Sequence, residues 1–281
     1  MQAIARDVWV ETDFQGCSVG FVVTSEGVVM IDSPMLPSQA LKWKAEMEKR
    51  AKLCYLVNTE HHLDHILGNF FFPVTVISHE GTREKFITSL GKLDEMRDYI
   101  KQLDPEGAKL LENYQPRMPS ITFSTGLNLH LGQYTFGLLN LPGHVENGVV
   151  VHVPEARVLF TGDNVSHGFY PWLHECVPLR WLKTLKEIKN MDVDVIVPGH
   201  GSVCTKEGIV PLANYLEAVI GEVQQMVDKG FSRQEAIAKA SFPPPLPIQP
   251  GLEGRFREIH CTGVGRIYDE LVKAQEAEGL A

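Results

Sequence analysis

Four side chains of the kinds that bind metal ions lie within six consecutive residues, at Glu60, His62, Asp64 and His65. The apolar run just before them, residues 54–57, predicts a short buried strand that ends at this cluster. Carboxylates and imidazoles without a thiolate form a donor set suited to Zn²⁺, Fe or Mn²⁺. The cluster is too dense for ordinary core or solvated surface, so we interpret the segment as part of a metal site.

Three later segments repeat the order of an apolar strand, a glycine and then His or Asp, at residues 138–144, 158–163 and 193–200. The ligand-type residues at their ends are His144, Asp163 and His200. Four strand ends would therefore deliver acids and imidazoles to one place. We expect a single metal site that is assembled in three dimensions.

The spacing of the first cluster predicts which side chains face each other. In an extended segment side chains alternate between faces, so Glu60 and His62 point one way and His61 the other. Asp64 and His65 follow on the turn into a helix, offset from the first pair. We therefore expect two adjacent metal ions: the first held by Glu60, His62 and His144, the second by Asp64, His65 and His200, with Asp163 bridging both.

Four short blocks carry a family resemblance. They read Asn-Thr-Glu-His-His-Leu-Asp-His at 58–65, Pro-Gly-His at 142–144, Thr-Gly-Asp at 161–163 and Pro-Gly-His-Gly at 198–201. Together with residues 27–32 and 77–80 they resemble the metallo-β-lactamase superfamily of hydrolases, over roughly residues 8–204. The resemblance implies an α/β fold, a four-layer αβ/βα sandwich, with the metal site along one edge. It also implies two divalent metal ions, with zinc expected first and manganese or iron as alternatives.

One position departs from the family pattern, which is HxHxDH. Its first His is Glu60 here, and His61 cannot substitute because it faces away. A third carboxylate lowers the net charge of a bare two-ion site from about +2 to about +1, which favours a harder ion such as Mn²⁺ or Fe. Glu60 is therefore expected to be a ligand, and it leaves the identity of the metal open.

The resemblance implies a metal-dependent hydrolase in which a metal-bound hydroxide attacks a small ester, lactone, thioester or amide. Asp64 is the candidate catalytic residue, orienting the hydroxide and passing a proton to the leaving group. Asp32 is expected to support a ligand or the fold. One alternative is a mononuclear iron oxidoreductase or dioxygenase, because Glu60, His62 and His144 are two His plus one carboxylate. The other is a degenerate member that only binds a ligand.

An aromatic loop follows Asp163 and is expected to lie near the metals. Its candidate substrate-binding residues are His167, Tyr170, Trp172 and His174. Four other imidazoles are expected on the surface or satisfied in the core: His61, His130, His152 and His260.

The order of the expected elements predicts two parts. Residues 1–204 would form the αβ/βα domain, with an antiparallel meander at the start and a helical insertion over residues 82–113. Residues 205–281 would form a C-terminal helical segment packed on the same domain, with a capping box at Ser232 and Glu235. Residues 242–250 are rich in proline and must be extended.

Composition limits the function classes. The net charge of −9 argues against nucleic-acid binding, which needs clustered Lys and Arg. Five Cys without a CxxC pair indicate free thiols in a reducing compartment. With no signal peptide and no membrane-spanning stretch in view, we expect a cytoplasmic protein whose partner is a small-molecule substrate. The C-terminal helices could form a homodimer interface, and a simple cap is equally consistent.

Overall fold

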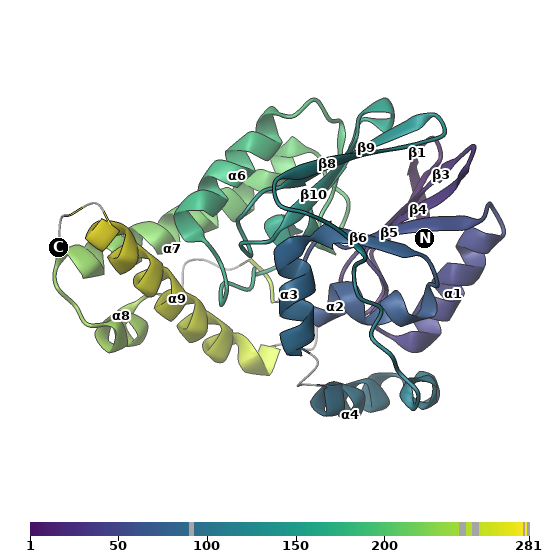
Figure 1. Cartoon of the computed structure of the whole chain (residues 1–281). Helices are drawn as coiled ribbons and strands as arrows, with labels where there is room; N and C mark the ends of the chain where they lie inside the picture. The colour runs from purple at the N-terminus through teal and green to yellow at the C-terminus, as the bar shows by residue number, and fades with distance from the viewer. Residues whose placement is uncertain (90–92, 242–245, 249–252, 278, 280–281) are drawn as a thin grey trace.

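Two β-sheets face each other in this structure, a computed structural model that describes residues 1–89, 93–241, 246–248, 253–277 and 279 (Figure 1). The first sheet has the order β1-β2-β3-β4-β5-β6-β7 and the second the order β13-β11-β10-β9-β8. The strands of the first are β1 (Gln2–Ala5), β2 (Val8–Glu11), β3 (Val19–Thr24), β4 (Gly27–Ile31), β5 (Leu53–Val57), β6 (Thr75–His79) and β7 (Ile121–Phe123). Those of the second are β8 (Gly126–Leu131), β9 (Tyr134–Asn140), β10 (Val149–Val153), β11 (Val158–Phe160) and β13 (Val195–Val197).

The strand directions explain why ligand residues gather at one edge. Strands β1 to β4 form an antiparallel meander, as expected. From β4 to β7 the neighbours are parallel, and β11 is parallel to β13 in the second sheet. Parallel neighbours deliver their carboxyl ends to the same edge.

Apolar side chains between the sheets form the central core. Strand β9 alternates buried Tyr134, Phe136 and Leu138 with more exposed residues, as a strand with one covered face does. These residues share a cluster with Val22 and Val57 of the first sheet. Burying such a side chain contributes about 1.5–3 kcal/mol, so sheet packing is a main source of stability here.

Helices cover both outer faces. Helix α1 (Pro37–Glu48) packs Trp43 and Met47 against Phe21 of the first sheet. Helix α6 (Pro178–Asn190) packs Trp181 against the second sheet, where Leu159 points outward. The order helix, sheet, sheet, helix confirms the expected α/β class and αβ/βα sandwich.

The segment between β6 and β7 is helical, as predicted. It contains α3 (Glu80–Ser89), α4 (Leu93–Leu103) and α5 (Pro105–Ala108), followed by the 3₁₀ helix η3 (Lys109–Leu111). The helix that follows the first ligand cluster is short: α2 (Leu63–Ile66) is one turn long and continues as the 3₁₀ helix η1 (Leu67–Phe71). Its backbone passes so close to the first sheet that a Cβ on Gly68 would lie 2.2 Å from the carbonyl oxygen of Pro34.

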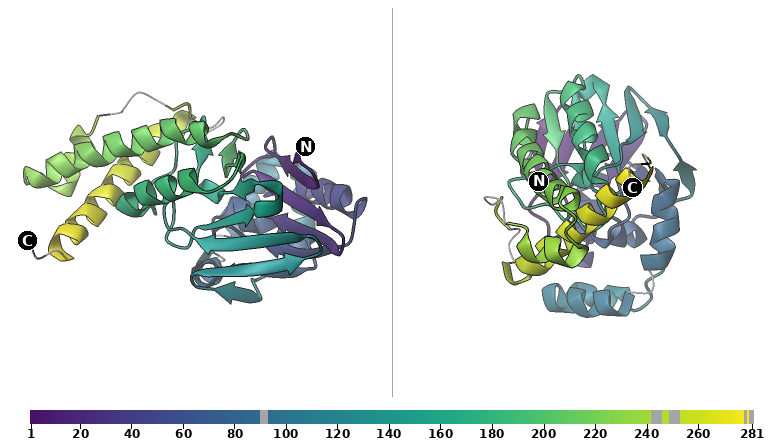
Figure 2. Two further views of the ribbon diagram at one scale, coloured as in Figure 1. Left: turned by 90° about the horizontal axis from the view of Figure 1, so that it is seen from above. Right: turned by 90° about the vertical axis from the view of Figure 1, so that its left-hand side faces the viewer.

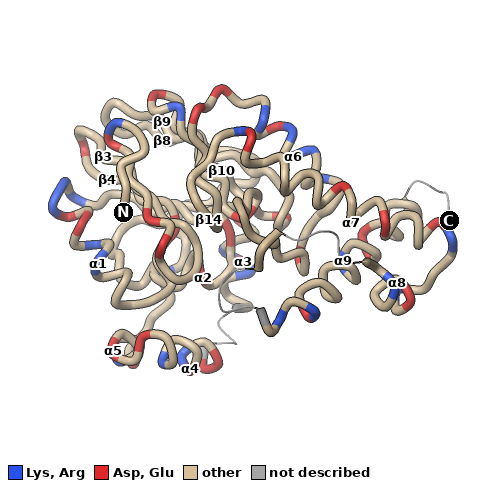
Figure 3. Tube along the Cα trace, turned by 180° about the vertical axis from the view of Figure 1, so that it is seen from behind, with Lys and Arg blue, Asp and Glu red and all other residues tan. Residues whose placement is uncertain are grey.

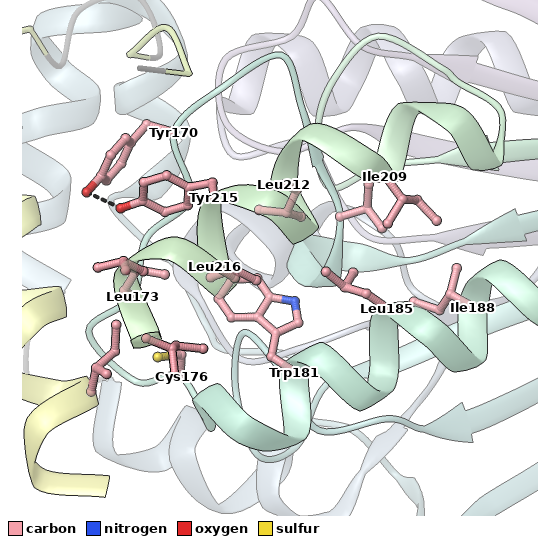
Figure 4. Packing of buried hydrophobic residues seen from close by; sticks show 14 of the residues in the cluster. Tyr170, Leu173, Cys176, Trp181, Leu185, Ile188, Ile209, Leu212, Tyr215 and Leu216 are labelled. Carbon is pink, nitrogen blue, oxygen red and sulfur yellow. Dashed lines mark hydrogen bonds between the residues drawn. The ribbon is translucent and has the colours of Figure 1, made fainter. Parts of the chain in front are cut away.

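The C-terminal segment is helical and shares its core with α6. Its elements are η6 (Lys206–Ile209), α7 (Val210–Asp228), α8 (Arg233–Lys239), η7 (Glu253–Arg255) and α9 (Phe256–Ala277). Leu216 of α7 lies in one buried cluster with Trp181 (Figure 4). Ile267 of α9 belongs to the same cluster. The capping box of Ser232 and Glu235 is present. The outer parts of these helices project away from the sheets (Figure 2).

The proline-rich segment is only partly described. Of the proline-rich residues 242–250, only 246–248 are described, and they form neither helix nor strand; the rest lie outside the described residues.

Acidic and basic positions are interspersed along the trace (Figure 3). None of the described helices has the length and apolarity needed to cross a bilayer.

Candidate metal centre

The ligand-type residues all follow strand ends at one edge of the sandwich. Residues 58–62 follow β5, and His144 follows β9. Asp163 lies in the 3₁₀ helix η5 (Gly162–Asn164) after β11. His200 begins the short strand β14 (His200–Gly201), which pairs with β12 (Ser166–His167). The strand-end arrangement expected from the sequence is therefore present.

Four residues form a first group: Glu60, His62, His144 and Asp163, with ligand atoms that all lie within 4.8 Å of one another. Nδ1 of His62 is 2.5 Å from Oε2 of Glu60 and 3.3 Å from Nε2 of His144. Oδ2 of Asp163 is 3.6 Å from the same nitrogen of His144. Three of the four are buried and His62 is half-buried, so the group is largely shielded from bulk water.

Asp64, His65 and His200 form a second group. Nε2 of His200 is 3.4 Å from Oδ2 of Asp64, and Nε2 of His65 is 3.9 Å from the same oxygen. Asp163 reaches this group too: its Oδ2 is 3.2 Å from His200 and its Oδ1 3.3 Å from His65. Asp163 thus lies between the two groups.

Glycines allow this close approach. A Cβ on Gly199 would lie 1.9 Å from Oδ1 of Asp163, and Gly162 has a φ of +51° beside Thr59. Gly199 leaves no room for a Cβ, and Gly162 combines a left-handed backbone with a site where a Cβ would lie 2.7 Å from the hydroxyl oxygen of Thr59. The Thr-Gly-Asp and Pro-Gly-His-Gly blocks are therefore explained by backbone packing around Asp163.

The donor set fits divalent cations. Oε2 of Glu60, Nε2 of His65 and Oδ1 of Asp163 are buried and find no well-directed hydrogen bond among the described residues. Buried polar atoms without partners are costly. Three carboxylates that converge with four imidazoles are a donor set that cations satisfy.

The charges of the site residues support this fit. Burial raises the pKa of Glu60, but the imidazoles of His62 and His144 outweigh it and hold that pKa at about 2. Burial lowers the pKa of His200, but the carboxylate of Asp163 outweighs it and raises that pKa to about 10. The pKa values of His62 and His65 are raised as well, by their neighbouring carboxylates against the effect of burial, while burial lowers that of His144. Without a metal, protonated imidazoles therefore pair with the carboxylates, and binding a cation must displace protons.

A buried acid supports His65 from behind. Oδ2 of Asp32 is 2.9 Å from Nδ1 of His65, so Nε2 faces the second group. Asp32 also accepts hydrogen bonds from the backbone N–H and hydroxyl of Thr59, at 2.8 and 2.6 Å. Its φ of +53° places it in the left-handed region, where Asp is among the better tolerated residues. A further group of Cys17, Asp32 and His65 results, which the sequence did not indicate.

His61 belongs to neither of the two groups; it contacts Glu175 and forms a separate set of ligand-type residues with Glu175 and His62. Nε2 of His61 is 3.3 Å from Oε2 of Glu175, and the ammonium of Lys85 contacts the same oxygen. Sequence reasoning missed Glu175 and Lys85. The only signal was an acid next to His174 in the aromatic loop.

A narrow cavity opens beside the groups. Its lining residues are His144, Asp163, Ser166, Tyr170, Pro171, Trp172 and His200. Its free volume of about 10 Å³ is room for roughly one water-sized group. Tyr170 and Trp172 line it as expected. Sequence reasoning missed Ser166 and Pro171.

The other two residues expected in the cavity wall lie elsewhere. The ring of His174 is 5.2 Å from that of His62 and 5.7 Å from that of Trp172, beside the cavity. His167 is turned away, with Nδ1 2.8 Å from the carbonyl oxygen of Ser202. It is held there because β12 pairs with β14.

Comparisons with known proteins give a family match over most of the chain. The sequence profile of the Metallo-beta-lactamase superfamily matches residues 12–200. Hydroxyacylglutathione hydrolases of Brucella ovis and Brucella abortus are 29% identical over 174 residues, which is 60% of this chain and 55% of theirs. The match thus spans little more than half the length of these relatives.

Solved structures show the same fold. A metallo-beta-lactamase from Pontibacter korlensis superposes with a TM-score of 0.61 at 18% identity, covering 77% of this chain and 97% of that one. TMB-1 superposes with a TM-score of 0.59 at 15% identity, covering 77% and 96%.

Proposed function

Because the chain belongs to the metallo-beta-lactamase superfamily, we propose that it is a hydrolase that works with two divalent metal ions on a small ester, lactone, thioester or amide. One observation carries the proposal. Asp163 lies between two ligand groups, with Oδ2 3.6 Å from His144 of the first and 3.2 Å from His200 of the second. A carboxylate shared in this way suits a pair of adjacent cations.

Each group would hold one ion. The first has Glu60, His62 and His144, the second has Asp64, His65 and His200, and Asp163 serves both. When bound, the ions would supply a Lewis acid and lower the pKa of a water molecule. Zinc is the first expectation from the nitrogen-rich donors. The third carboxylate, Glu60, keeps manganese and iron as alternatives.

Asp64 would orient the attacking water. Its side chain is one-quarter exposed, so the carboxylate borders solvent as well as the second group. Burial raises the pKa of Asp64, but His65 and His200 outweigh it and hold that pKa at about 2. A carboxylate that stays ionised accepts hydrogen bonds from a nucleophilic water without holding its proton. We therefore assign Asp64 an orienting role and a transient one in proton transfer.

The cavity wall narrows the substrate class. Tyr170, Pro171 and Trp172 present mostly apolar surface, and Ser166 is the polar residue beside them. Because the cavity has room for only about one water-sized group, this wall would border the smallest, partly apolar part of a substrate whose remainder lies outside it. The hydroxyacylglutathione named for the Brucella relatives is a thioester, which puts thioesters first for testing.

The alternatives have less support. In the first group Asp163 joins Glu60, His62 and His144, so it holds two carboxylates and differs from the two-His-one-carboxylate set of iron oxygenases. All seven ligand-type residues converge, which is more than a degenerate binding protein needs.

The test is hydrolysis by protein purified without added metal. We expect turnover of at least one class in a panel of acyl thioesters, lactones and esters, loss of activity with a chelator, and recovery with Zn²⁺ or Mn²⁺. The Glu60→Gln variant should lose activity, and the matched variant Glu187→Gln, on the outer face of α6 and paired with Arg180, should keep it. Oxygen uptake by iron-loaded protein without hydrolysis of the panel would contradict the proposal.

A further inference from the structure

The two ring nitrogens of His62 face different partners. Nδ1 faces the first group, 2.5 Å from Glu60 and 3.3 Å from His144. Nε2 is buried on the opposite side and finds no well-directed hydrogen bond among the described residues. The acid on that side is Glu175, whose Oε1 is 4.0 Å from Nε2. The imidazole therefore lies between a ligand group and a second carboxylate.

Glu175 is held in place by its own partners. Its Oε2 is 3.3 Å from Nε2 of His61 and contacts the ammonium of Lys85 on α3. Its Oε1 is also 3.9 Å from Nε2 of His174. The hydrogen bond with His61, together with Lys85, keeps the pKa of Glu175 well below its usual range, so the side chain stays ionised. The Glu175 carboxylate, which belongs to the aromatic loop, thus contacts both the segment that carries His61 and His62 and helix α3.

The other half of the site has a similar arrangement with a shorter contact and a buried acid. His65 turns Nε2 toward the second group and Nδ1 toward Asp32, at 2.9 Å. In each case one ring nitrogen faces the ligands and the other faces an acid. An acid in that position selects the tautomer, holds the ring orientation and makes the free nitrogen a better ligand.

We propose that Glu175 is a positioning residue of the first group: its carboxylate faces the Nε2–H of His62 at 4.0 Å, and its negative charge favours the tautomer that leaves Nδ1 free to bind a cation. This inference rests on the proposed two-ion function. Lys85 and His61 hold the carboxylate where it can act. Because Glu175 directly follows His174 in the aromatic loop, it also ties the cavity wall to a metal ligand.

A titration of zinc tests the inference. Metal-free protein is titrated with Zn²⁺ in competition with a chromogenic chelator, for the wild type, Glu175→Gln and the control Glu187→Gln. We expect two binding events in the wild type and the control. In Glu175→Gln one event should weaken by about 10–100-fold while the other stays within about twofold. Lys85→Met should weaken the same event to a smaller extent, and Lys85→Arg should restore it.

Three results would overturn the inference in distinguishable ways. If the zinc affinities of both binding events in Glu175→Gln stay within about twofold of the wild type, Glu175 does not position a metal ligand. Suppose instead that both weaken equally and that the metal-free variant unfolds at a lower temperature than Glu187→Gln; the role is then structural. If the wild type itself shows no binding event, the two-ion function fails, and this inference fails with it.

Discussion

Oδ2 of Asp32 lies 2.9 Å from Nδ1 of His65, on the side of the ring opposite the second ligand group. Both side chains are buried, and Asp32 is also held by two hydrogen bonds from Thr59. The imidazole is therefore fixed before any cation arrives, which lowers the cost of ordering it on binding.

Asp32→Asn should weaken metal binding at the second group. Asn has nearly the same shape and tolerates the left-handed backbone of this position, but it is a weaker acceptor for the imidazole N–H. We expect about a 10–100-fold loss of affinity for one ion, measured by chelator competition. Asp194→Asn, at an exposed pair with Arg157, is the control and should change nothing. Equal affinities in both variants would contradict the supporting role.

Glu60→His restores the family pattern and should change metal preference. Removing one carboxylate would raise the net charge of the proposed two-ion site from about +1 to about +2. An added imidazole favours zinc over manganese, so the ratio of Zn²⁺ to Mn²⁺ affinity should rise. Metal content after dialysis against an equal mixture of both ions measures this ratio. An unchanged ratio would mean that Glu60 is not a ligand.

Metal affinity should rise with pH. The folded metal-free protein holds a proton on His200, whose pKa is raised to about 10 by Asp163 and Asp64 against the effect of burial. A bound cation must displace that proton, so affinity should increase by about tenfold per pH unit for each proton released. Calorimetric titrations at pH 6.5, 7.5 and 8.5 in buffers of different ionisation enthalpy count the protons. A count of zero would contradict the charge state derived for the site.

The same proton predicts how stability depends on pH without metal. Because the folded pKa of His200 lies above the unfolded value of about 6.5, its stabilising contribution is complete below that value. The contribution is lost as the pH rises toward about 10. The free energy of unfolding of metal-free protein should therefore fall from pH 7 to pH 9.5. In the His200→Gln variant the free energy of unfolding should fall less over the same pH range. A fall of the same size as in the wild type would exclude His200 as the cause.

A buried tyrosine pair ties the cavity wall to the C-terminal helices. The hydroxyl of Tyr215 on α7 donates to that of Tyr170 (Figure 4). The Tyr170 hydroxyl lies 2.9 Å from Nδ1 of His260 on α9. Tyr215→Phe leaves buried polar groups short of a partner and should cost about 1–3 kcal/mol of unfolding free energy. Tyr99→Phe, at an exposed position, should cost less than about 0.5 kcal/mol. Equal losses in urea denaturation would show that the pair contributes nothing.

Local pattern predicted part of this site and long-range packing decided the rest. The alternation of faces predicted that Glu60 meets His62 in a group that does not contain His61, because it depends on three neighbouring residues only. Glu175 and Lys85 were missed because they are 90 residues apart and meet only in the folded chain. His167 was expected at the cavity, and the pairing of β12 with β14 turns it aside.

The helices show the same division. The capping box at Ser232 could be predicted from the sequence because both of its residues lie within one helical turn. The end of α2 after a single turn could not be predicted from the sequence. It depends on a long-range contact, because the chain after α2 passes close to the carbonyl oxygen of Pro34 at Gly68. The boundary expected at residue 204 stays a prediction, since α6 and α7 share one core.

The central claim is that two cations lie on either side of Asp163. A crystal of zinc-loaded protein, with diffraction data collected above and below the zinc absorption edge, tests it most directly. The account predicts two anomalous peaks, one about 2.0–2.2 Å from ligand atoms of Glu60, His62 and His144, and one equally close to Asp64, His65 and His200. A single peak, or a first peak that Glu60 does not contact, would contradict it.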